Sequence, residues 1–216
     1  MHFKALLIMD KSPIERINEI KTLMERSSKF LSLSGWSGIW VGLCGMAASA
    51  IAYFMLDIQI DYYSHHTPKT LDQLLVLAGV TLILSIAGGF YFIAKKAKKE
   101  GMPFINTVSK RILIHFSIPL LVGGILSFIF IYHDFFVFVA PTTLLFYGLA
   151  LFSVYQDTLS EVKFLSCMEI ILGLLAFFFL GNGLLFWFIG FGVLHFVYGI
   201  LMWNKYDKKL DKLDKK

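Results

Sequence analysis

Ionisable side chains are scarce within the long apolar runs of this sequence, so the few that occur there are the first candidates for chemistry. Glu169 lies six residues beyond Lys163 in one run, and His195 and His115 lie in two others. An acid or a histidine inside a membrane helix usually faces the interior of its bundle, where it can bind a proton or an ion. Glu169 and His195 on adjacent helices would form either a proton- or substrate-binding pair or a structural contact between helices.

Further hydroxyl groups could bond to this pair, namely those of Tyr147, Tyr198 and Ser166. The sequence contains no nucleophile motif, no phosphate-binding glycine loop and no HExxH pattern. It therefore predicts neither enzymatic activity nor a cofactor. The expected intramembrane polar site consists of Glu169, His195, His115 and Tyr198.

Other ligand-type residues do not combine into a metal or haem site. His65 and His66 stand beside acidic residues, but adjacent histidines rarely face one ion, so a solvated loop is expected there. A haem between histidines of two helices has no further support in the sequence. Cys44 and Cys167 lie in apolar runs, and without a CxxC pair they are expected to be buried free thiols.

The elements that must position these residues are membrane helices. The chain has 216 residues, of which 57% are hydrophobic and 16% charged, whereas soluble domains have about 45–50% and about 25%. A spanning helix needs about 20 apolar residues. The sequence predicts an all-α, single-domain bundle of six transmembrane helices, arranged as three hairpins. The expected spans are 33–56, 74–94, 112–132, 135–155, 162–180 and 183–203.

The basic residues predict the orientation. Nineteen of the twenty Lys and Arg residues fall on one side of these spans, and only Lys69 falls on the other. Because cytoplasmic loops carry the excess of Lys and Arg, both termini are expected to be cytoplasmic in a bacterial-type inner membrane. The net charge of +5 then indicates anionic lipid headgroups as a partner rather than nucleic acid. The expected headgroup-facing residues are Lys95, Lys96, Lys98, Lys99, Lys110 and Arg111.

Two segments flank the spans. Residues 1–32 contain a capped, amphipathic pattern that begins near Ser12 and predicts a cytoplasmic leader helix. Residues 204–216 are rich in Lys and Asp and are expected to form a solvated tail.

Small residues leave one face of the first span nearly bare. Their spacing of three and four positions permits close helix approach, either within one chain or across a homo-oligomer. The residues are Gly35, Gly38, Gly42 and Gly45.

The last two spans resemble a hairpin of the small bacterial acid-resistance membrane proteins, on the strength of residues 169–173 and 198–200. That resemblance implies three hairpins. More broadly, the chain resembles small six-helix inner-membrane proteins of bacteria, which implies no activity and no catalytic residues. We expect a non-enzymatic structural, stress-related or partner-supporting membrane component. The alternative is a small proton- or ion-coupled transporter or channel that uses Glu169.

Overall fold

The computed structural model describes residues 14, 17, 33–55, 68–101, 105 and 107–208. Over these residues the chain forms six helices and no strand, in agreement with the predicted all-α class. The first five are α3 (Gly35–Met55), α4 (Pro68–Lys99), α5 (Thr107–Tyr132), α6 (Val139–Val154) and α7 (Ser160–Phe178).

The sixth helix changes its hydrogen-bond pattern along its length. It begins as α8 (Gly183–Trp187), passes through the π-helical segment η4 (Phe188–Leu194), continues as α9 (His195–Met202) and ends in a second π segment, η5 (Trp203–Asp207). We call this continuous run the last helix. Short 3₁₀ turns connect or extend other elements: η1 (Phe136–Phe138), η2 (Tyr155–Asp157) and η3 (Leu180–Asn182).

Five of the six helices are long and apolar enough to cross a membrane, as an integral, multipass membrane protein requires. α7 is the exception, because it carries the charged residues Glu161, Lys163 and Glu169 within its 19 residues. Its predicted role as a sixth span stays a prediction.

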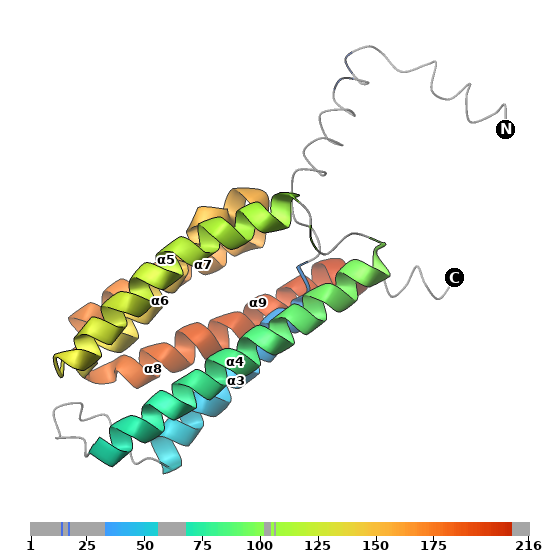
Figure 1. The fold of residues 1–216 in the computed structure, drawn as a ribbon. Coiled ribbons are helices and arrows are strands. Elements are labelled where there is room, and N and C mark those ends of the chain that lie inside the picture. The colour runs from blue at the N-terminus through green and yellow to red at the C-terminus, as the bar shows by residue number, and fades with distance from the viewer. Residues whose placement is uncertain are drawn as a thin grey trace, which may run out of the picture.

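The helices pack in two groups (Figure 1). α5, α6 and α7 lie together, and α3, α4 and α9 lie together. The last helix joins the groups, since α8 contacts α6 and α9 packs along α3. The predicted three-hairpin arrangement is not confirmed: α7 packs mainly on α6, and the last helix mainly on α3.

The bare face of α3 packs against the last helix of the same chain. A Cβ atom placed on Gly42 would lie 2.5 Å from the backbone nitrogen of Phe196, and one on Gly38 would lie 2.9 Å from the Cα of Gly199. Glycine is therefore required where the two backbones approach each other. Of the two arrangements left open by the sequence, the structure contains the one within a single chain.

The flanking segments are described only in part. The predicted leader helix in residues 1–32 lies outside the described residues except for Ile14 and Ile17, which are both exposed. Residues 209–216 of the predicted tail and the loop that contains His65 and His66 also lie outside them.

Candidate functional site

A buried polar cluster connects three helices in the interior of the bundle. It consists of Glu169 on α7, His195 at the start of α9 and Tyr147 on α6. Glu169 is 0% and His195 3% exposed. The Nδ1 atom of His195 lies 3.4 Å from Oε1 of Glu169, and its Nε2 atom lies 2.7 Å from the Tyr147 hydroxyl. The predicted pairing of Glu169 with His195 is thus present in the fold.

The π segment η4 determines the tautomer of His195. Its Nδ1 lies 2.9 Å from the carbonyl oxygen of Gly190, five residues earlier in the chain. A carbonyl oxygen only accepts hydrogen bonds, so Nδ1 carries a proton and donates it to this contact. In the neutral ring, Nε2 then accepts a hydrogen bond from the Tyr147 hydroxyl. Both ring nitrogens therefore have partners.

The carboxyl group of Glu169 is enclosed by neighbouring atoms that do not hydrogen-bond to it. Among the described residues, neither of its oxygens has a hydrogen-bond partner. A Cβ atom on Gly190 would lie 2.7 Å from Oε2, so glycine leaves the space that the carboxyl occupies. Burying a charged carboxylate costs free energy unless it is paired, and His195 is the titratable group placed beside it.

The other residues of the predicted site lie elsewhere. His115 has an exposed side chain on α5, and its backbone carbonyl accepts a hydrogen bond from Ser153 Oγ at 3.0 Å. Tyr198 packs against α3, where its Cδ1 would lie 3.1 Å from a Cβ on Gly38. The Ser166 hydroxyl donates to the carbonyl of Lys163 at 2.7 Å. Of the additional hydroxyl groups expected near the pair, Tyr147 is the one that bonds to His195.

Two prominent cavities of the described structure are lined by neither Glu169 nor His195. One, of about 210 Å³, has almost entirely apolar walls. The other, of about 450 Å³, is lined by Ser34, Trp36, Phe92, Lys95, Lys96, Lys99 and Asp207. The polar cluster borders neither of these two cavities.

A second buried polar cluster joins the two ends of the described chain. The Asp207 carboxylate accepts hydrogen bonds from the backbone N–H of Gly35 at 2.9 Å and from Ser34 Oγ at 3.3 Å. Its other oxygen lies 2.8 Å from Lys96 Nζ, which also donates to the carbonyl of Leu33 at 2.8 Å. Asp207 thereby supplies the acceptor that the first turn of α3 lacks.

This cluster corrects two expectations. Lys96 is only 8% exposed and binds a carboxylate of its own chain, so it does not face headgroups. Asp207 is 9% exposed and belongs to η5, so this residue of the predicted solvated tail packs against the bundle. The positions of the charged residues in the sequence could not distinguish Lys96 and Asp207 from neighbouring charged residues that are solvated.

The remaining predicted headgroup residues lie on the surface. Lys95, Lys98, Lys99 and Lys110 are exposed at the same end of the bundle as Asp207, which we call the basic end. Arg111 is also exposed, but its guanidinium forms a two-point ion pair with Asp157 of η2, in which Nε donates to Oδ2 at 2.9 Å.

Ligand-type residues elsewhere do not gather. Within the residues that the structure describes, no three His, Cys, Asp or Glu side chains form a group that could hold a metal ion. Cys44 and Cys167 are free thiols, as expected, but they are half-buried rather than fully buried.

Comparisons with known proteins add no family to this description. No protein-family model, no curated protein and no solved structure matches the chain.

Proposed function

We propose that the chain is a non-enzymatic integral membrane protein that serves as a structural, stress-related or partner-supporting component of a bacterial-type cytoplasmic membrane. The observation that carries this proposal is the enclosure of Glu169, which is 0% exposed. Neither described cavity reaches its carboxyl group. A transported proton or ion needs an aqueous path to the acid that binds it, so the enclosure supports a structural role.

In this role the buried cluster holds three helices in register. Tyr147, Glu169 and His195 come from α6, α7 and the last helix, respectively. Hydrogen bonds between membrane helices contribute about 0.6 kcal/mol on average and up to about 2 kcal/mol. Here these contacts also fix the rotation of the helices, because each of the three helices must be correctly rotated about its axis for the contacts to form.

The proposal includes an orientation and a lipid partner. Both termini would be cytoplasmic, and the basic end would face anionic headgroups through Lys95, Lys98, Lys99 and Lys110. Each base near such a surface is worth about 1 kcal/mol. Support comes from the sequence distribution of basic residues and from the exposure of these four side chains.

Proton flux through reconstituted protein tests this function. The full chain would be placed in liposomes that enclose a pH-sensitive dye, and a potassium diffusion potential would drive protons inward. We expect the flux to equal that of protein-free liposomes, because the carboxyl group of Glu169 is enclosed. The matched variants are Glu169→Gln and Glu161→Gln, which remove one acid each from the same helix.

The transporter alternative makes the opposite prediction. A flux above the protein-free level that Glu169→Gln abolishes and Glu161→Gln preserves would overturn the structural role. A flux that neither variant changes would also refute it, and would place the ion path away from Glu169.

A further inference from the structure

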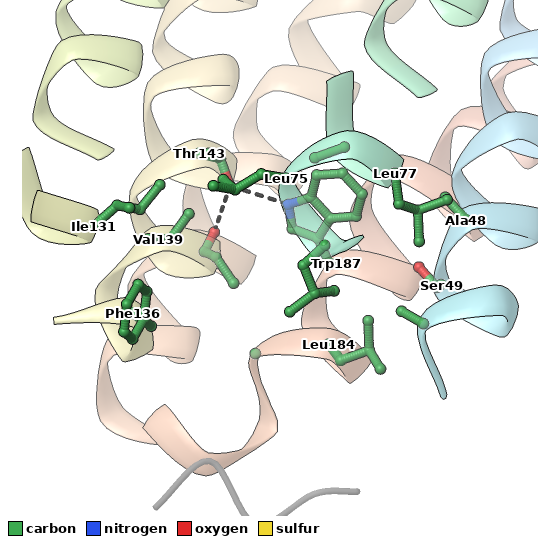
Figure 2. Close-up of a pocket in the computed structure, with 15 residues that line it drawn as sticks. Ala48, Ser49, Leu75, Leu77, Ile131, Phe136, Val139, Thr143, Leu184 and Trp187 are labelled. Atoms are coloured by element: carbon green, nitrogen blue, oxygen red, sulfur yellow. Dashed lines mark hydrogen bonds between the residues drawn. The ribbon is translucent and has the colours of Figure 1, made fainter. Parts of the chain in front are cut away.

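The apolar cavity of about 210 Å³ lies between the two groups of helices. Its walls come from α3, α4, α8, the end of α5 and the start of α6, at the end of the bundle opposite the basic end. Figure 2 shows its side chains gathered around the indole of Trp187. No charged residue lines it, and only Ser49, Thr143 and Trp187 carry hydrogen-bonding side chains.

Two of these three polar groups bond to each other. Trp187 Nε1 donates to Thr143 Oγ1 at 3.0 Å, and Thr143 Oγ1 donates to the carbonyl of Ala140 at 2.9 Å. The third polar group, the hydroxyl of Ser49, is not bonded in this way. Ser49 is 4% exposed, and its hydroxyl has no hydrogen-bond partner among the described residues. Figure 2 shows this hydroxyl directed toward the side of the cavity where Trp187 lies.

The cavity is accessible from the surface of α4. Leu75 is 43% exposed, and Ala78, one helical turn further along, is exposed as well. α4 is among the helices that can cross a membrane, so its outer surface would face lipid. A hydrocarbon chain can therefore enter from the bilayer without crossing the packed interior.

The walls specify the chemistry of the occupant. Apolar cavities of about 150 Å³ stay dry and bind small hydrocarbons such as benzene, so this larger one can hold a segment of an alkyl chain. An unpaired buried hydroxyl costs free energy, which a ligand with one acceptor atom would recover. The uncharged lining excludes a headgroup. We propose that the cavity binds an acyl chain of a glycerolipid, with the Ser49 hydroxyl donating a hydrogen bond to the ester carbonyl of that chain.

Photochemical labelling tests the occupancy. The full chain would be placed in nanodiscs of phosphatidylethanolamine and phosphatidylglycerol with a trace of phospholipid that carries a diazirine on its acyl chain. Labelled residues would be located by mass spectrometry. We expect labelling at cavity residues to exceed that on the exposed face of α5, and Ala78→Phe to reduce it at least fivefold by filling the cavity.

Ala87→Phe is the matched control. Ala87 is exposed on the same helix but does not line the cavity, so this variant should label like the parent chain. Equal labelling of cavity residues in both variants would overturn the proposal. Loss of the label to competing free fatty acid, but not to unlabelled phospholipid, would assign the cavity to a free chain and would also refute it.

The role of the hydroxyl is tested by ester- and ether-linked versions of the same probe. The ether lacks the carbonyl oxygen, so the parent chain should prefer the ester by roughly three- to tenfold, the value of one neutral hydrogen bond. Ser49→Ala should lose this preference, and Ser49→Thr should keep it. Equal labelling by both probes in the parent chain, or an ester preference that survives in Ser49→Ala, would remove Ser49 from the site.

Discussion

At the scale of single residues, Glu161 shows how one carboxylate holds the last helix against α7. It forms an ion pair with Lys205 and accepts a hydrogen bond from the Tyr206 hydroxyl at 3.1 Å. Partial burial on its own would raise the pKa of Glu161. The hydrogen bonds from Lys205 and Tyr206 outweigh that effect and lower the pKa below its ordinary value of 4.5.

This lowered pKa predicts a specific acid sensitivity. The carboxylate is favoured by the folded state, so its contribution to stability is complete above pH 4.5 and is lost as the pH falls through the lower, folded-state pKa. Thermal unfolding in detergent would be followed from pH 7 to pH 3 for the parent chain and for Glu161→Gln. We expect the difference in Tm to be constant at neutral pH and to shrink in acid; a difference that grows in acid would contradict the assignment.

Predictions for single residues succeeded where the position of a residue within an apolar run decided whether its side chain is buried. Glu169 and His195 were expected to meet because both lie well inside adjacent runs, and they are 3.4 Å apart. His115 lies in an equally apolar run but is exposed, because helix rotation, not depth, decides which way a side chain faces. Asp207 was missed because its partner, the first turn of α3, is 172 positions away in the sequence.

At the scale of elements, the contact between α3 and the last helix is the closest approach of backbones described here. A Cβ on Gly42 would lie 2.5 Å from Phe196 N and 2.8 Å from the carbonyl oxygen of Gly192. The glycine spacing predicted that α3 would have such a face. It did not identify the partner, because other helices, such as α4 and α5, also carry glycines that could form a narrow face.

Gly42→Ala should destabilise the bundle by about 1–3 kcal/mol, since the added methyl group forces two backbones apart. Gly79 of α4 provides the control, because a Cβ there would have no neighbour within 4 Å. Gly79→Ala should be neutral or stabilising by about 0.5–1 kcal/mol, the usual gain when glycine leaves a helix interior. The measurement is thermal unfolding followed by circular dichroism, and similar losses in both variants would contradict this account of the packing.

Helix existence was predictable, but helix irregularity was not. Hydropathy located every described helix, because about 20 apolar residues must satisfy their own backbone hydrogen bonds in lipid. The π segments of the last helix leave no such signal. In η4 the altered pattern accompanies the contact between the Gly190 carbonyl and the His195 ring, five residues apart in the same helix.

At the scale of the whole molecule, the proposed orientation can be measured with two single-cysteine variants. Cys44 and Cys167 would first be replaced by alanine. His133→Cys then lies in the turn between α5 and η1, and Gln156→Cys lies in η2 at the basic end. A membrane-impermeant maleimide should label position 133 in intact spheroplasts and position 156 only in inverted vesicles. The reverse pattern would place the basic end outside the cell.

The pairing of α3 with the last helix has a consequence for how the protein is made. The ribosome completes α3 long before it completes residues 183–207. The glycine face of α3 is therefore unpaired while the four intervening helices are synthesised. The Asp207 carboxylate that caps Gly35 is synthesised 172 positions after it. Closure of the bundle is therefore a late event in biogenesis, and a stalled or shortened chain would leave the narrow face of its first span open to the insertion machinery and to proteolysis.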